Sequence, residues 1–247
     1  LSGNYLVEGD TIRVNLELID VKSNELLWRL NQFEVNFSQA FKLQDIVTDK
    51  VVEGLKIELS EQEFDRIHRD SATSPLAYEY YFRAISYPNT AEGNRLAVEM
   101  LKKSINIDDR FAPAYANLGK RIRNLEQFDL VDTKDTKTAE SYYLKALSLN
   151  PELLSALSYL SFFYTENNQI EKAVVLARKM KKINHNSPTA HFTLGYIYRY
   201  AGMVKQAINE METAVSMDRK NPRFRSLIGS YSGLNEYQKA LNMTSFY

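Results

Sequence analysis

The first part of the chain alternates between apolar and polar residues. Residues 11–18 alternate at every step, which predicts a β-strand with one buried face. Residues 1–8 are typical of an earlier strand, and Gly9-Asp10 between the two suits a tight hairpin turn. A third extended stretch, residues 25–37, places its apolar side chains at even positions and then, past Asn31-Gln32, at odd positions. Because this change of parity predicts a β-bulge, we expect a three-stranded antiparallel sheet that contains one.

From Ser38 the apolar residues follow the spacing of a helix. They recur every three or four residues between Phe41 and Leu59, which predicts an amphipathic helix. Three strands and one helix form only a thin core. We therefore expect a preceding segment, or the part of the chain that follows, to cover this small α/β unit, and Trp28 to lie in its core. The polar residues 60–74 predict a linker or a short helix.

The rest of the chain repeats itself every 34 residues. Leu194-Gly195 recurs as Ile228-Gly229, and Leu160-Ser161 lies 34 residues before it. Ala173 and Ala207 are separated by the same 34 residues. A period of this length predicts pairs of antiparallel helices stacked in a row.

This period divides residues 78–247 into five units, of which the last is truncated. The second unit carries about eight extra residues within 126–137, which predicts a longer loop between its two helices. Small residues where two helices cross allow the axes to approach to about 8–10 Å. These small residues are Gly119, Ala146, Ala173, Gly195, Ala207 and Ala214. The five units are Tyr78–Phe111, Ala112–Leu153, Leu154–Ser187, Pro188–Asn221 and Pro222–Tyr247.

On these residues, the segment 78–247 resembles tetratricopeptide repeats. The resemblance implies a mainly α protein, a right-handed superhelix of about four and a half helix-turn-helix repeats. The N-terminal segment resembles the latter half of a TolB amino-terminal-like α/β domain, with three antiparallel strands and one helix. That resemblance is carried by Tyr5–Gly9, Val14–Asp20, Asn24–Trp28 and Ala40–Asp45. The implied domains are residues 1–59 for the α/β unit, 60–77 for a linker and entry segment, and 78–247 for the repeats.

In bacteria, the TolB-like domain commonly precedes such repeats in class III adenylate or guanylate cyclases, winged-helix transcription regulators and some protein kinases. The first half of that domain is absent here, so we expect the chain to be a fragment of a longer polypeptide. Ser23-Asn24 stands where the second turn usually has Gly. Asn tolerates the left-handed conformation, so we expect the turn to be preserved.

The composition narrows the function further. Lys and Arg number 31 and Asp and Glu also number 31, so no overall positive charge favours nucleic-acid binding. No apolar run is long enough for a membrane span, so we expect no direct membrane insertion. There is no Cys, which excludes a thiol nucleophile or a Cys-ligated zinc site. The compartment stays open between cytoplasm and periplasm.

No motif for catalysis or for a metal, nucleotide or other cofactor occurs in the sequence. The three histidines are too badly spaced for a metal site: His191 holds a repeat position that favours packing in the core, and His185 a turn position that favours exposure. Asp108-Asp109 ends a repeat helix, where a solvated pair is favoured over a catalytic one. We therefore expect no active site in this chain, no cofactor and no metal.

A binding groove is the remaining candidate, because the first helix of each repeat lines the concave face of such an array. Aromatic and cationic residues at positions 2, 5, 9, 12 and 13 of the repeats suit an extended, acidic peptide or protein partner. They include Thr165 and the predicted groove residues Lys120, Arg123, Asn124, Phe162, Phe192, Tyr196, Arg199, Tyr200 and Arg223. A chaperone-type carboxylate clamp is not favoured, since only scattered residues such as Asn117 match it.

The function that we expect is a non-catalytic regulatory scaffold of a bacterial multidomain signalling protein, adenylate or guanylate cyclase-like, which binds a protein or peptide. The alternative is a structural component of a periplasmic envelope assembly. An exposed edge of the N-terminal sheet predicts a possible homodimer.

Overall fold

The computed structural model describes residues 2–20, 23–36, 39, 42–126, 139–219, 221–233 and 237–244. It divides into two compact units, which are treated separately below. The first consists of Leu1–Ser86 and Lys102–Phe111, and the second of Tyr87–Leu101 and Ala112–Tyr247.

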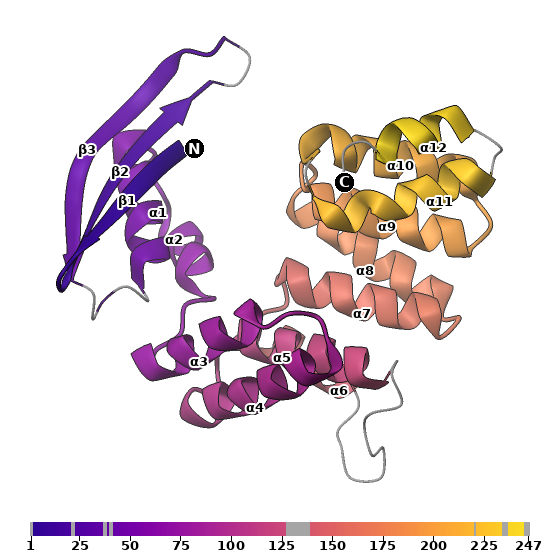
Figure 1. Ribbon diagram of the computed structural model, residues 1–247, viewed down its shortest axis with the longest axis horizontal. Coiled ribbons are helices and arrows are strands. Elements are labelled where there is room, and N and C mark those ends of the chain that lie inside the picture. Colours follow the sequence, from indigo (N-terminus) through magenta and orange to yellow (C-terminus); the bar gives the residue numbers. More distant parts are fainter. Residues whose placement is uncertain are drawn as a thin grey trace. The chain divides into compact units, whose positions relative to one another are not determined.

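The first unit contains the predicted antiparallel sheet (Figure 1). Its strands β1 (Ser2–Glu8), β2 (Thr11–Ile19) and β3 (Leu26–Asn36) pair in the order β1-β2-β3. Gly9 has a φ of 57°, which the hairpin turn requires and glycine adopts without strain. Asn24 in the second turn has a φ of 58°, so the expected left-handed asparagine is confirmed.

The predicted bulge is present in β3. Val14 pairs with Phe33 while Leu16 pairs with Leu30, so Asn31 and Gln32 together stand opposite Asn15. The Oδ1 atom of Asn15 accepts the backbone N–H of Gln32 at 3.0 Å and thereby satisfies the looped-out backbone. The bulge keeps the apolar side chains of both halves of β3 on one face, where they pack against a buried core. That core consists of Ile12, Val14 and Leu16, with Trp28, Leu30 and Phe33 packed against it.

Helix α1 (Leu43–Gly54) covers this core and is shorter than the sequence pattern predicts. Its residues Leu43 and Val47 pack against the sheet. The apolar stripe runs on to Leu59, but the helix ends at Gly54 and Leu55 is 38% exposed. A Cβ on Gly54 would lie 2.0 Å from the ring of Trp28, so the predicted core tryptophan closes the end of this helix.

Strand β1 lies at the edge of the sheet with all its side chains exposed. Tyr5 is 72% and Leu6 54% exposed. Within the described residues no strand pairs with its outer edge. The homodimer through this edge stays a prediction.

The segment 60–77 contains ordered structure. Helix α2 (Glu61–His68) starts with a capping box, in which Ser60 and Glu63 satisfy each other's backbone N–H groups. The linker or short helix left open by the sequence is thus a short helix. Helix α3 (Pro75–Ser86) follows, and Ala77 accepts a hydrogen bond from Ser104 Oγ at 2.7 Å.

Asp108 corrects one prediction. Both the backbone N–H and the hydroxyl of Thr73 donate to its carboxylate, at 2.7 and 2.8 Å, and Arg110 N–H donates at 3.1 Å. Its 5% exposure shows that the expected solvated pair was wrong for Asp108, although Asp109 is exposed. The buried carboxylate joins the entry of α3 to the turn that follows residue 107, a contact between distant residues that the local pattern does not show.

The repeats form consecutive helix pairs, so the predicted fold class is confirmed (Figure 1). In the second unit the pairs are α5 with α6, α7 with α8, α9 with α10 and α11 with α12, while α4 contributes to both units. The predicted long loop at 126–137 falls largely outside the described residues. The helices are α4 (Ala91–Ile107), α5 (Ala112–Glu126), α6 (Ala139–Leu149), α7 (Leu154–Glu166), α8 (Ile170–Ile183), α9 (Pro188–Tyr200), α10 (Val204–Met217), α11 (Ser226–Gly233) after the short 3-10 helix η2 (Pro222–Arg225), and α12 (Tyr237–Thr244).

Within each pair, small residues lie where the helices cross. A Cβ on Gly119 would come within 2.7 Å of the ring of Tyr143, and one on Gly195 within 2.7 Å of Met211 Cγ. The predicted crossing alanines Ala146, Ala173, Ala207 and Ala214 are completely buried. Each helix pair therefore packs with its axes as close as these residues permit.

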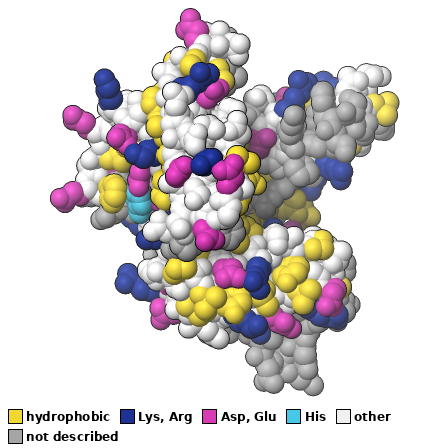
Figure 2. Space-filling model, turned by 60° about the vertical axis from the view of Figure 1, so that its left-hand side comes forward, with side chains coloured by type: hydrophobic (Ala, Val, Ile, Leu, Met, Phe, Trp, Pro, Cys, Tyr) yellow, Lys and Arg dark blue, Asp and Glu magenta, His cyan; other side chains and the backbone are white. Residues whose placement is uncertain are grey.

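Charged side chains do not gather by sign on the face seen in Figure 2. There, lysines and arginines are interspersed with aspartates and glutamates among the described residues. This agrees with a formal net charge of zero and with the absence of a field that attracts polyanions.

The crossing contact predicts a matched pair of stability effects. In Gly195→Ala, the new methyl group would lie 2.7 Å from Met211 Cγ and 2.9 Å from the carbonyl oxygen of Ala207. We expect the free energy of unfolding to fall by about 1–3 kcal/mol, as measured by urea denaturation.

The control is Gly229→Ala, at the equivalent position one repeat later. Its Cβ would have only Arg199 Nη1 nearby, at 3.7 Å. We expect it to be neutral or to stabilise by up to about 1 kcal/mol, because alanine favours helix over glycine. Equal losses in the two variants would contradict the close-packing argument.

Candidate peptide-binding site

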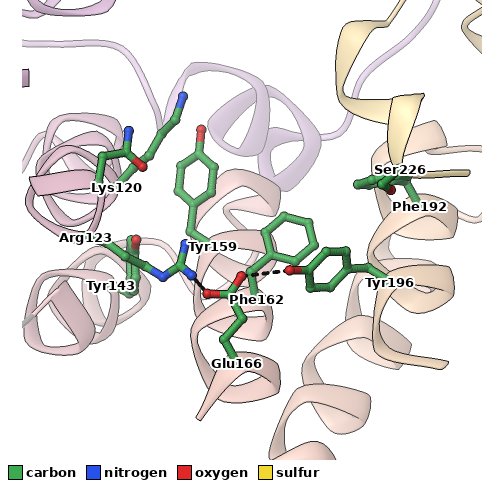
Figure 3. A pocket seen from close by; sticks show the side chains of 10 residues that line it. Lys120, Arg123, Tyr143, Tyr159, Phe162, Glu166, Phe192, Tyr196 and Ser226 are labelled. Atoms are coloured by element: carbon green, nitrogen blue, oxygen red, sulfur yellow. Dashed lines mark hydrogen bonds and ion pairs between the residues drawn. The ribbon is translucent and has the colours of Figure 1, made fainter. Parts of the chain in front are cut away.

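The second unit contains a pocket of about 280 Å³ formed by the first helices of four consecutive pairs (Figure 3). Helices α5, α7, α9 and α11 each contribute side chains to it, and α6 adds one. The residues that line it are Lys120, Arg123, Asn124, Tyr143, Tyr159, Phe162, Glu166, Phe192, Tyr196 and Ser226. Stacking of the helix pairs thus brings together residues from four repeats at one place.

Most of the predicted groove residues lie at this pocket. It is lined by Lys120, Arg123, Asn124, Phe162, Phe192 and Tyr196. Arg199 and Tyr200 lie next to it through contacts with Tyr196. The side chain of Arg223 lies outside the described part of the chain.

Three lining residues were missing from the predicted set. Ser226 occupies position 5 of its repeat, so the spacing rule that gave the other residues could have found it. Tyr159 lies one position past that rule, at position 6 of its repeat. Tyr143 comes from a second helix, which no rule based on first helices includes.

Glu166 is the electrostatic centre of the pocket. Its carboxylate forms an ion pair with the guanidinium of Arg123 and accepts a hydrogen bond from the hydroxyl of Tyr196 at 2.8 Å (Figure 3). The hydroxyl of Tyr200 lies 3.1 Å from that of Tyr196 and extends the chain of hydrogen bonds. Burial raises the pKa of Tyr196, so its hydroxyl stays protonated and donates to the carboxylate. The charge of Arg123 is therefore balanced within the pocket.

Aromatic rings form one wall. The rings of Phe162 and Tyr196 meet edge to face with their centroids 4.8 Å apart, and Phe192 lies 4.9 Å from the core residue Phe224. The expectation that these aromatic residues are exposed was wrong for Phe192, which is 5% exposed. Phe192 joins the wall to the core, while Phe162 and Tyr196 are half-buried and Tyr200 is exposed.

The cations around the pocket contact rings and backbone. Arg199 donates to the carbonyl oxygen of Ser226 at 3.1 Å, and its guanidinium lies 5.1 Å from the ring centroid of Tyr196. The ammonium group of Lys120 lies 5.6 Å from the ring centroid of Tyr159. Such contacts hold the rings and cations in a fixed arrangement.

Hydrogen bonds within the helices and to a preceding turn hold two further predicted residues. Thr165 is 2% exposed and donates to the carbonyl of Ser161, so it does not face a groove. The Asn124 side-chain amide donates to Asn89 at 2.7 Å. On the same turn, the buried guanidinium of Arg121 donates to the carbonyl of Tyr87 at 2.9 Å, and burial lowers its pKa.

The histidines lie as the repeat pattern predicts. His191 is 9% exposed, with Nδ1 2.6 Å from a carboxylate oxygen of Glu210 and Nε2 3.0 Å from the carbonyl of His185, while the His185 side chain is exposed. Among the residues that the structure describes, no group of three or more His, Cys, Asp or Glu side chains could hold a metal ion. Over the same residues, no helix combines the length and apolar character needed to cross a membrane.

Comparison with known families identifies the repeats. The family model described as tetratricopeptide repeat matches residues 130–153 and 188–221. The second match coincides with the repeat unit Pro188–Asn221. The protein is thus a mainly helical tetratricopeptide-repeat protein with an N-terminal three-stranded antiparallel sheet. Repeats of this kind mediate contacts between proteins.

A solved structure shows the same fold. A thermophilic tetratricopeptide-repeat protein of Thermus thermophilus superposes with a TM-score of 0.57 at 16% identity, over 68% of this chain and 88% of that one. The MamA protein of Desulfovibrio magneticus RS-1, residues 41 to the end, gives a TM-score of 0.47 at 16% identity, over 70% and 94% of the two chains.

A curated relative is similar in sequence. A putative adenylate cyclase 3 of Rhizobium meliloti (strain 1021) is 30% identical over 127 residues, which cover 48% of this chain. The matched part is only 21% of that relative's length. The TolB-like character of the N-terminal unit stays a prediction.

Buried tyrosines predict alkaline sensitivity. Burial raises the pKa of Tyr143 and Tyr196, and burial together with a hydrogen bond to Glu140 raises the pKa of Tyr164 to about 12. An unfolded chain releases tyrosine protons near pH 10, whereas the folded chain still holds them. We therefore expect the free energy of unfolding to be unaffected by these groups below about pH 10 and to fall as the pH rises from 10 to 12.

Urea denaturation at several pH values tests this expectation. The Tyr164→Phe variant should show a shallower decline than the wild type over that range, because phenylalanine has no proton to lose. Identical slopes in the two proteins would contradict it.

Proposed function

We propose that this protein is a non-catalytic regulatory scaffold that binds a protein or peptide partner at the pocket between α5, α7, α9 and α11. The observation that carries the proposal is the convergence of four consecutive repeats on one aromatic pocket. Aromatic residues and arginines that form a partly enclosed surface are typical of the side chains that dominate binding energy at protein interfaces. Their rigid mutual contacts reduce the cost of ordering them when a partner binds.

The proposal extends to the protein of which this chain would be a part. The similarity to a putative adenylate cyclase over a fifth of its length supports a cyclase-like, multidomain bacterial signalling protein. The three antiparallel strands and helix α1 support residues 1–59 as the latter half of a TolB amino-terminal-like domain, followed by an entry segment at 60–77 and repeats over 78–247. In such a protein, docking at the pocket would be passed along the stacked helices to an output domain.

A capture experiment tests the partner-binding role. The full chain is immobilised, exposed to a bacterial lysate, and the retained proteins are identified by mass spectrometry. In Tyr196→Ala, the loss of a ring that contacts Phe162 and Glu166 should weaken the bound partner by about 1–3 kcal/mol, a loss of roughly tenfold to a hundredfold in affinity. Purified partner and protein then give this value by titration calorimetry.

The matched control is Val175→Ala on α8, a residue that is 66% exposed and does not line the pocket. It should retain the partner with unchanged affinity. Circular dichroism should show the same helix content in all three proteins. A partner that both variants hold as tightly as the wild type would exclude the pocket as its binding site.

A further inference from the structure

The charges of the pocket disfavour an acidic ligand group inside it. Arg123 already has a carboxylate partner in Glu166. A ligand carboxylate could reach this guanidinium only by displacing Glu166 or by lying beside it, where two like charges repel each other. A neutral group meets neither cost. This argument revises the acidic-peptide expectation for the interior of the pocket.

The size and walls of the pocket suit one large side chain. Its volume of about 280 Å³ lies at the lower limit for sites that enclose whole small molecules, which is roughly 300 Å³. Five of its lining side chains are aromatic: Tyr143, Tyr159, Phe162, Phe192 and Tyr196. An aromatic ring would contact these walls by stacking and edge-to-face packing.

One polar group in the lining has no partner. Among the residues that the structure describes, the hydroxyl of Ser226 is the buried side-chain group without a hydrogen bond. Ser226 lines the pocket at the start of α11, on the side of Phe192 (Figure 3). A buried hydroxyl left unpaired costs free energy, so a ligand that bonds to it gains an interaction that the empty pocket lacks.

We propose that the pocket holds an aromatic side chain with a hydrogen-bonding edge, a tyrosine or a tryptophan, presented by the partner. The rings of the pocket take the aromatic body, and the hydroxyl of Ser226 takes the polar edge. This inference rests on the proposed function, since it names the group by which the partner is recognised at the same pocket.

Blocked tripeptides test the inference directly on the full chain. Acetyl-Ala-Xaa-Ala-amides with Xaa as Tyr, Trp, Phe or Asp are titrated and followed by the amide chemical shifts of the protein. We expect saturable binding of the Tyr and Trp peptides with a Kd on the order of 1 mM, weaker binding of Phe, and no saturation with Asp. Ser226→Ala should weaken the Tyr peptide about fivefold and leave the Phe peptide unchanged.

A second variant exposes the role of Glu166. Glu166→Gln leaves the charge of Arg123 unbalanced, so the Asp peptide should now bind. Tighter binding of Asp than of Tyr to the wild-type protein, equal Tyr and Phe affinities, or no saturation with any tripeptide would each overturn the aromatic anchor. The proposed function would survive these results if Tyr196→Ala still loses a captured partner, and it alone fails if the pocket variants leave capture unchanged.

Discussion

The close approach of the two helices in each pair is the constraint on which the binding surface depends. Position 8 of the repeats carries Gly119, Ser161, Gly195 and Gly229. At Gly195, the backbone of the first helix lies so near Met211 and Ala207 that an added methyl group has no room. Because the pairs are held at this short distance, their first helices form a continuous layer in which side chains from four repeats meet.

Within that layer, one carboxylate organises the pocket. Glu166 binds Arg123 of the preceding repeat and Tyr196 of the following one. Removing it would leave Arg123 half-buried beside the nearly buried ring of Tyr143 without a counter-charge, a costly arrangement in a partly enclosed site. The same contact that joins three repeats therefore also determines that the pocket is electrically neutral at its centre.

Much of the fold could be predicted from the sequence, because its signals are local or periodic. Alternation gave the strands, the change of parity at Asn31-Gln32 gave the bulge, and the 34-residue period gave the helix pairs. The failures involve contacts between distant residues. Helix α1 ends at Gly54, where the ring of Trp28 closes it, and Asp108 is buried because Thr73 donates to it. The repeat positions identified most pocket residues but could not show that Arg123 is paired or that Phe192 is buried.

The repeats also separate the residues that maintain the fold from those that select a ligand. Successive residues of a helix point roughly 100° apart, so position 8 can face the partner helix while position 9 faces the pocket. Position 8 is small in four repeats, yet position 9 carries Lys120, Phe162 and Tyr196, which are a cation and two aromatic rings. Substitutions at position 9 can thus alter recognition without disturbing helix packing, whereas those at position 8 alter the packing itself. A pocket assembled from position 9 of successive repeats is for this reason free to be specific in a protein whose fold is repetitive.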